Sequence, residues 1–71
     1  MPHAYSSKCI IKVLLKKGFF IVSQKGSHIK LRKITHRQLI VIVPANKKII
    51  PLGTFRSILS QSDCTEDDFK K

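Results

Sequence analysis

Apolar and polar residues alternate along the chain with two different periods, and these periods predict where helices and strands lie. Between residues 8 and 17, apolar side chains recur every three or four positions, and a lysine occupies every fourth position on the opposite side. This spacing is typical of an amphipathic helix. Ser6 or Ser7 can cap its first turn, and Gly18 follows where a helix commonly ends.

A period of two is typical of the segments that follow. Residues 19–24 are rich in aromatic and β-branched side chains, residues 28–33 alternate strictly between apolar and polar, and residues 39–43 form an apolar run that stops at Pro44. The segments that separate them are short and contain turn-forming residues. We therefore predict three antiparallel strands joined as a meander.

The middle segment separates apolar from polar side chains most clearly. Ile29 and Leu31 fall on one face of the predicted strand, whereas His28, Lys30 and Arg32 fall on the other. The outer strands are less regular, so we expect some apolar side chains beside the polar ones on this second face. These either fill the flanks of the polar strand or form a protein-docking patch.

A second helix is predicted after the strands. Thr54 is its expected N-cap, and Phe55, Ile58 and Leu59 give an apolar stripe with the i, i+3, i+4 spacing. A three-stranded sheet cannot bury its apolar side alone, so both helices are expected to pack on one face of it.

The whole chain, residues 1–71, is predicted to form one small α+β domain with the order α-β-β-β-α. Residues 1–5 are expected to be a loose N-terminus. Residues 63–71 are expected to form an acidic C-terminal turn, with a helix start at residues 65–68 and Phe69 as its apolar anchor.

Charge is distributed very unevenly along the chain. The formal net charge is +10, residues 1–62 contain no Asp or Glu, and all four acidic residues lie between residues 63 and 68. A segment with this dense positive charge and no carboxylates favours a polyanionic partner, most simply nucleic acid. It also excludes paired-carboxylate catalysis and a carboxylate-bound Mg²⁺, unless the acidic tail folds back to supply ligands. Histidine is then the best available acid or base.

The two cysteines and the lengths of the apolar runs bear on where the protein works. Cys9 and Cys64 are too few for a disulfide scaffold or a cysteine-rich zinc site, and we interpret them as reduced thiols. No apolar stretch approaches the roughly 20 residues that span a membrane, and no signal peptide is recognised. We therefore expect a cytoplasmic protein that uses no metal and no small-molecule cofactor.

The segment from Gln24 to His28 carries the best candidate chemistry. Gly26 allows close approach of the backbone to a phosphate, and the N–H groups of such a turn can bind anions. His28 follows the turn on the polar face, with Lys25 and Lys30 nearby. A neutral imidazole can accept the proton of an RNA 2′-OH, whose oxygen then attacks the adjacent phosphate. Judged on these residues alone, His28 is either catalytic or a phosphate or surface contact.

Two motifs resemble the HicA toxin family, also called YcfA-like. The first is Val-Ser-Gln-Lys-Gly-Ser-His at residues 22–28, preceded by Gly-Phe at residues 18–19, and the second is Gly-Thr-Phe-Arg-Ser-Ile-Leu at residues 53–59. The resemblance covers nearly the whole chain in the same order. It implies a double-stranded-RNA-binding-domain-like fold and an mRNA interferase that blocks translation. It also implies that His28 is the catalytic histidine and that a HicB-type antitoxin neutralises the toxin.

The chain departs from the family pattern at two places. The family usually has one more residue before the Gly-Phe pair, so the turn from helix to strand is expected to be tighter here. It often has a histidine soon after the Val-Pro pair, where this chain has Ala45, so the role of that position is not carried over.

Three functions are compatible with these features. We predict an endoribonuclease toxin that cleaves mRNA with a single histidine and no metal; the alternative is a non-catalytic RNA-binding module of the same fold. A cationic membrane-active protein is the third, which the β-rich pattern disfavours. His3 and His36 are expected to be surface residues. The predicted RNA contacts lie around His28 and in the basic loop before the second helix: Lys25, Gly26, Ser27, Lys30, Arg32, Lys47 and Lys48.

Overall fold

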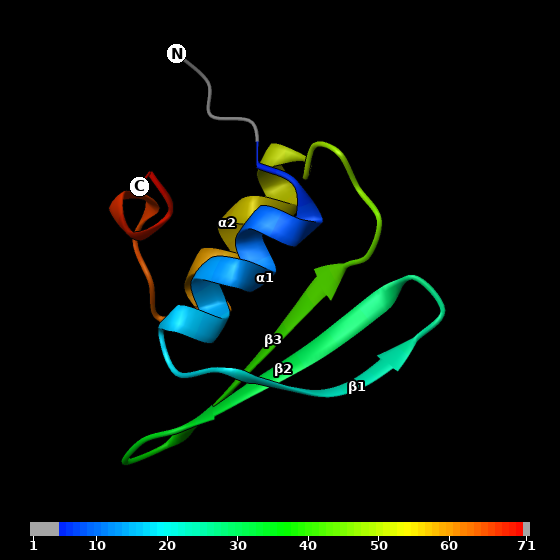
Figure 1. The fold of residues 1–71 in the computed structure, drawn as a ribbon. Helices are drawn as coiled ribbons and strands as arrows, with labels where there is room; N and C mark the ends of the chain where they lie inside the picture. Colours follow the sequence, from blue (N-terminus) through cyan, green and yellow to red (C-terminus); the bar gives the residue numbers. More distant parts are fainter. Residues whose placement is uncertain (1–4, 71) are drawn as a thin grey trace.

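A computed structural model describes residues 5–70 of the chain (Figure 1). The predicted order α-β-β-β-α is confirmed, and a short 3₁₀ helix follows it. The elements are α1 (Ser7–Lys16), β1 (Phe20–Lys25), β2 (His28–Ile34), β3 (Gln38–Pro44), α2 (Leu52–Ser62) and η1 (Glu66–Phe69).

Helix α1 begins and ends where the sequence pattern predicted. The side chain of Ser6 accepts a hydrogen bond of 3.1 Å from the backbone amide of Cys9, which satisfies one of the free amides of the first turn. At the other end Gly18 has a φ of 100°, which favours glycine, and the amide of Phe19 donates to the carbonyl of Leu14 at 3.0 Å. The chain therefore turns sharply from α1 into β1.

The three strands form one antiparallel sheet in the order β1-β2-β3, so β2 is the central strand. On β2, Ile29 and Leu31 are buried, whereas His28 and Lys30 are exposed. The predicted alternation of the middle strand is confirmed. We call the side of the sheet on which His28 and Lys30 lie the open face.

Strand β1 contains an irregularity that the sequence pattern did not predict. Its pairing with β2 shifts between Ile21 and Ser23, so that one residue of β1 is extra and forms a β-bulge. After the shift Ser23 stands opposite Lys30, and Gln24 stands opposite Ile29. The side chain of Ser23 therefore lies on the open face, and that of Gln24 lies on the helix side.

Both helices lie on the same side of the sheet, as predicted (Figure 1). Their apolar side chains pack against the apolar side of the sheet to form the core. The central members are Ile10 and Leu14 from α1, Phe55 and Ile58 from α2, and Ile29, Leu31, Val41 and Val43 from the sheet. No helix of the described residues covers the open face, which stays free for a ligand.

The predicted N-cap of the second helix is wrong. Thr54 lies inside α2, and the residue before the helix is Pro51. The φ of Pro51 is −58°, and its carbonyl accepts a hydrogen bond of 2.9 Å from the amide of Phe55. A proline suits this entry because its φ is already restricted to the helical range and it has no N–H to leave unpaired.

Helix α2 also protects one edge of the sheet. The side-chain oxygen of Gln61 accepts a hydrogen bond of 3.1 Å from the backbone amide of Ile42 on β3. This contact occupies an amide that would otherwise be available to a further strand. The other edge strand, β1, is exposed along nearly its whole length.

The C-terminal turn is part of the core. Phe69 in η1 is 1% exposed, and its ring lies edge-on to those of Tyr5 and Phe55, with centroids 6.1 Å and 5.5 Å away. The anchoring role predicted for Phe69 is confirmed. The prediction of a loose N-terminus is wrong at Tyr5, which is buried because its ring completes this cluster; residues 1–4 lie outside the described part.

An ion pair ties the C-terminal turn to the end of α1. Lys17 Nζ lies 2.8 Å from Asp68 Oδ1. The hydrogen bond from Lys17, together with one from the backbone amide of Thr65, holds the pKa of Asp68 below its ordinary value. Because the folded-state pKa is lowered, the stability that this carboxylate contributes is present above its ordinary pKa. It is lost as the pH falls through the lowered value.

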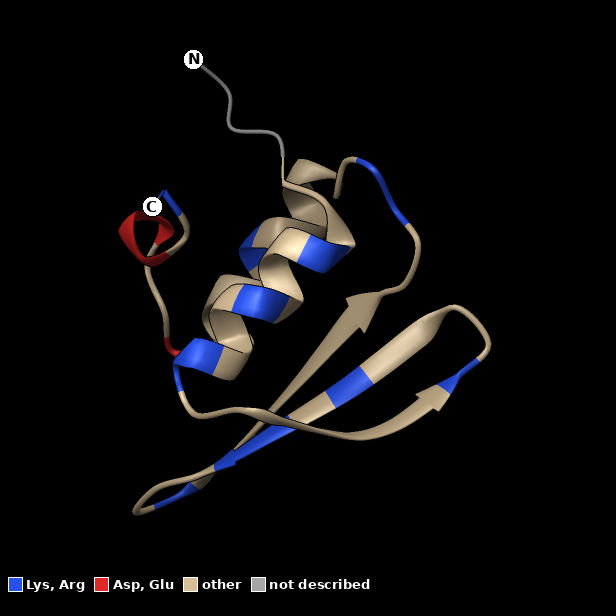
Figure 2. Ribbon diagram, in the orientation of Figure 1, with Lys and Arg blue, Asp and Glu red and all other residues tan. Residues whose placement is uncertain are grey.

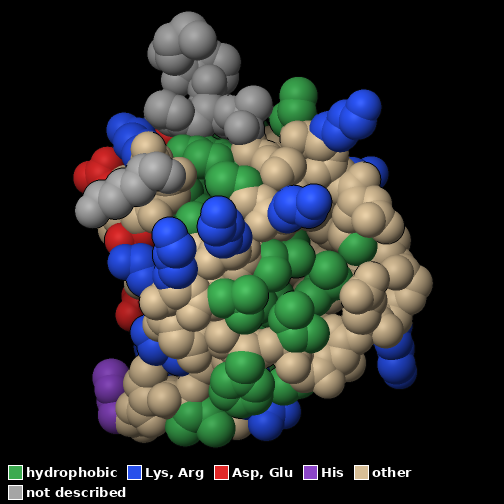
Figure 3. Space-filling view, in the orientation of Figure 1, with side chains coloured by type: hydrophobic (Ala, Val, Ile, Leu, Met, Phe, Trp, Pro, Cys, Tyr) green, Lys and Arg blue, Asp and Glu red, His purple; other side chains and the backbone are tan. Residues whose placement is uncertain are grey.

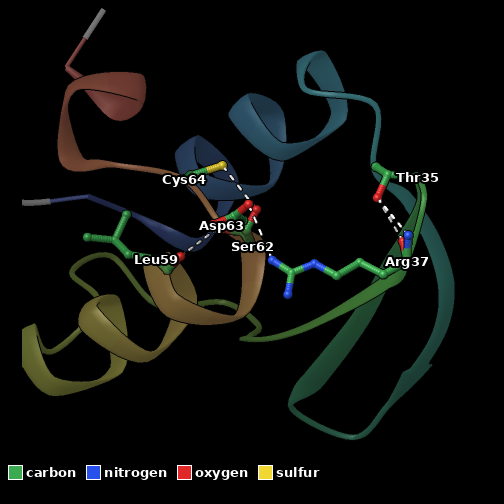
Figure 4. A network of polar contacts seen from close by, with 6 residues as sticks. All are labelled: Thr35, Arg37, Leu59, Ser62, Asp63 and Cys64. Carbon is green, nitrogen blue, oxygen red and sulfur yellow. Dashed lines mark hydrogen bonds and ion pairs between the residues drawn. The ribbon is translucent and has the colours of Figure 1, made fainter.

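The turn between β2 and β3 lies at the end of the sheet opposite to His28. Thr35 Oγ1 accepts from the amide of Arg37 at 3.2 Å and donates to its carbonyl at 2.8 Å. The side chain of Arg37 reaches Asp63 at the end of α2, where Arg37 Nη2 lies 3.4 Å from Asp63 Oδ2 (Figure 4).

Lys and Arg are spread over α1, the sheet and the loops, whereas Asp and Glu are confined to the C-terminal end (Figure 2). None of the described helices has the length and apolarity needed to cross a membrane.

Replacing Phe69 with alanine is expected to lower the free energy of unfolding by about 3–5 kcal/mol, the usual cost of truncating a buried phenylalanine. Chemical denaturation followed by circular dichroism measures the change. Phe20→Ala is the matched control, because Phe20 is 44% exposed and should cost less than about 1 kcal/mol. Equal losses in the two variants would show that the C-terminal turn is not part of the core.

Candidate active site

The turn between β1 and β2 determines where His28 lies. Lys25 and His28 are directly opposite each other in the register, so Gly26 and Ser27 are the two central residues of a tight hairpin turn. Gly26 has a φ of 55°, and two-residue hairpin turns need positive φ at this position. Apart from its chain neighbours, no heavy atom lies within 4 Å of the position that a Cβ of Gly26 would take. The backbone of the turn is therefore open to a ligand.

His28 borders a hollow of about 210 Å³ on the open face. Side chains from all three strands line it: Ser23, Lys25, His28, Lys30 and Ile42. Lys25 comes from the facing strand and Lys30 from two positions further along β2. The structure thus brings together an imidazole and two ammonium groups, which can accept a proton and hold an anion in the same place.

Apolar side chains flank the polar ones on the open face, as predicted. In the register Arg32 lies between Phe20 of β1 and Ile40 of β3, and Ile42 borders the hollow itself. Phe20 and Ile42 are 44% and 37% exposed. Arg32 is half-buried, and its Nε is buried between these neighbours without a hydrogen-bond partner among the described residues.

Lys47 and Lys48 do not line the hollow beside His28. They line a larger groove of about 600 Å³ on the helix side of the same hairpin, between α1 and the loop that precedes α2. The residues predicted to contact RNA are therefore divided between the two sides of the β1–β2 hairpin. Gly26 and Ser27 form the turn between these two sides.

Ser7 holds the basic loop against the first turn of α1. Its hydroxyl donates to the carbonyl of Pro44 at 2.6 Å and accepts from the amide of Lys47 at 2.9 Å, and its own amide donates to the carbonyl of Lys47 at 2.9 Å. The amide of Ala45 donates to the carbonyl of Ser27 at 2.7 Å. Because Ser7 is buried, water competes little for these bonds. The loop therefore has a fixed position relative to the hairpin turn.

No second histidine joins His28 within residues 5–70. His36 lies exposed in the far turn, as expected, and His3 lies outside the described residues. Ala45 is buried and lines the groove on the helix side. Across the described residues, no group of three or more His, Cys, Asp and Glu side chains is arranged to hold a metal ion.

Ser23 and Ile42 were not predicted as site residues. Ser23 reaches the hollow only because the bulge in β1 shifts the register by one residue, and nothing in the sequence signals that shift. Alternation along the third strand predicts only that Ile42 faces away from Val41 and Val43, without saying which face is open. Its position opposite Lys30, and hence in the hollow, depends on how the strands pair.

The fold and the site together define a small α-β-β-β-α domain with a histidine in a lysine-lined hollow on the open face of its sheet. A family model described as HicA toxin of bacterial toxin-antitoxin matches residues 7–63 of the 71-residue chain. The chain therefore belongs to the HicA toxin family, and this membership implies an antitoxin partner. A search of curated proteins finds no match. The family match ends before η1, although Phe69 of η1 is a core residue.

Proposed function

We propose that this toxin is an endoribonuclease that cleaves mRNA without a metal ion, and so blocks translation, with His28 as its general base. The observation that carries the proposal is the hollow in which His28, Lys25 and Lys30 lie together on the open face. Membership of a toxin family supports it, because degradation of messenger RNA is harmful to the host cell.

In the proposed reaction the imidazole of His28 takes the proton of a ribose 2′-OH. The 2′-oxygen attacks the adjacent phosphorus, and the bond from phosphorus to the 5′-oxygen breaks. The 5′-oxygen leaves with a proton, so that one product ends in a 2′,3′-cyclic phosphate and the other begins with a 5′-hydroxyl. DNA lacks the 2′-OH and is not a substrate in this scheme.

The lysines beside His28 hold the phosphate and the negative charge that grows on it. Lys25 stands directly opposite His28, which puts their Cβ atoms about 5 Å apart. Lys30 lies on the same face, so both ammonium groups can reach a phosphate next to the imidazole. They are also the candidates to protonate the leaving 5′-oxygen, and Arg32 lies two positions beyond Lys30 on the same face.

Replacing His28 with alanine is expected to reduce RNA cleavage by roughly 10²–10⁴-fold, the usual contribution of a general base. Cleavage by the unaltered protein should persist in excess EDTA, because the proposed step uses no metal. Labelled RNA resolved on a gel measures the rate, and the 3′ ends of the products should carry a cyclic or 3′ phosphate. His36→Ala is the matched control, since His36 is exposed at the far end of the sheet and should keep full activity.

Loss of cleavage on chelation, restored by Mg²⁺, would contradict the single-histidine mechanism. If the unaltered protein binds RNA but does not cleave it, and His28→Ala binds equally well, the protein is a non-catalytic RNA-binding module of the same fold.

The affinity of the His28→Ala protein for single-stranded RNA is expected to fall steeply with salt. Each phosphate contact contributes about −0.7 to the slope of log affinity against log salt concentration. Replacing Lys25 or Lys30 with alanine should therefore make the slope shallower by about this amount, whereas Arg37→Ala at the far turn should leave it unchanged. If replacing Lys25 or Lys30 leaves the slope unchanged, the RNA does not bind at the open face.

We further propose that the antitoxin is of the HicB type and covers the open face. This face offers positive charge next to exposed apolar side chains such as Phe20 and Ile42. Charge complementarity with an acidic protein speeds association, and apolar contacts slow dissociation. An antitoxin bound here would occupy the hollow of His28 and exclude RNA.

Amide exchange on the purified toxin–antitoxin pair is expected to show protection of residues 24–33 relative to the free toxin. The complex should form quickly at low salt and remain bound at moderate salt. Ile42→Ser should raise the dissociation rate more than Ile49→Ser, which alters an exposed isoleucine in the loop before α2. Protection confined to residues 63–70, with His28 left open, would mean that the antitoxin inhibits by another route.

A further inference from the structure

The groove on the helix side of the β1–β2 hairpin has no part in the reaction proposed above. Three lysines line it: Lys8 on α1, and Lys47 and Lys48 in the loop before α2. All three are exposed, and the lining contains no Asp or Glu. A groove with this charge attracts an anionic ligand.

Two side-chain amides face the same groove. Gln24 lies at the end of β1 on the helix side, and Asn46 lies in the loop after β3. Both side chains are exposed, and neither makes a hydrogen bond to another described residue, so their donors and acceptors are available to a ligand. Asn and Gln side chains present a donor beside an acceptor, which is the pattern that pairs with the edge of a nucleobase.

Apolar side chains complete the groove. Ile29 is buried and Ile11 is half-buried, so they lie deeper than the exposed lysines and offer a surface on which a flat ring can pack. Figure 3 views this side of the molecule and shows apolar side chains gathered beside a row of lysines that runs over α1.

The groove and the hollow of His28 are the two sides of one hairpin. Gln24 and Lys25 are neighbours on β1 that point to opposite sides, and Ile29 and His28 have the same relation on β2. A strand that occupied both would cross the turn at Gly26, whose surroundings are open. The bonds of Ser7 to the basic loop keep the two sides of the groove in a fixed arrangement.

We propose that this groove is a base-binding subsite for RNA, which holds one unpaired nucleotide of the strand whose cleaved phosphate lies at His28. The base packs on Ile11 and Ile29, the amides of Gln24 and Asn46 pair with its edge, and the lysines hold the flanking phosphates. The inference rests on the proposed RNA-cleaving function and adds to it a source of sequence preference. An acidic segment of a protein partner is the other occupant to test, but the two unused amides favour a base.

The experiment measures binding of fluorescein-labelled A, C and U octamers to His28→Ala protein, by anisotropy at one fixed salt concentration. Gln24→Ala and Asn46→Gly each remove one amide. Glycine is chosen at position 46 because Asn46 has a left-handed φ of 59°, which glycine adopts without strain. The matched control for Gln24 is Gln38→Ala, an exposed glutamine at the opposite end of the sheet.

The parent protein is expected to prefer one of the three octamers, and each amide variant should reduce that preference roughly five-fold or more. Lys47→Ala should weaken binding of all three octamers to a similar degree, and Gln38→Ala should change nothing. Equal binding of the three octamers by the parent, or amide variants that behave like Gln38→Ala, would overturn the proposal. If the groove variants leave RNA binding intact but weaken binding of a HicB-type antitoxin, the groove is a protein-docking site instead. These results concern binding only, so a failure of the unaltered protein to cleave RNA is a separate outcome.

Discussion

Covering only one side of a three-stranded sheet is the constraint on which both the fold and the site depend. With 71 residues the chain forms two short helices, and both are needed to bury the apolar side of β2. Because side chains alternate along a strand, burying Ile29 and Leu31 obliges His28 and Lys30 to face the other way. The residues that make the core and those that make the site are thus alternate positions of one strand. A slip of one residue in the register would exchange them.

The sequence predicts most of this fold because apolar and polar residues alternate with clear helical and strand periods, and because recognisable capping residues mark the ends of α1. The strict alternation of residues 28–33 and the glycine after α1 each have one simple structural interpretation. The two errors have different causes. Thr54 is a good N-cap residue, yet Pro51 takes the N-cap position and α2 begins at Leu52, because the restricted φ of proline already suits the entry. Tyr5 looks like part of a polar terminus, yet it is buried because Phe55 and Phe69 offer it a place to pack.

The candidate site is less predictable than the fold. His28 and its lysine neighbours follow from a local motif and from alternation on one strand, so sequence alone can group them. The bulge that brings Ser23 into the hollow depends on pairing between strands. The separation of Lys47 and Lys48 from His28 depends on the path of a loop, which the bonds of buried Ser7 determine. Charge along the sequence indicates a polyanionic ligand, but it does not say on which side of a sheet each charge lies.

The mixed character of the open face has a consequence for the competition between the proposed substrate and the proposed inhibitor. RNA and an acidic antitoxin would both be attracted by the same lysines, and salt weakens both attractions. The apolar side chains beside the hollow act differently, because a phosphate backbone gains nothing from Ile42 or Phe20, whereas a protein partner can bury them. Burial of these side chains adds a favourable term that salt does not screen, and a protein that covers the whole face can bury more of them than a phosphate backbone does. An antitoxin bound there would therefore exclude RNA even at a salt concentration that weakens the attraction of both ligands to the lysines.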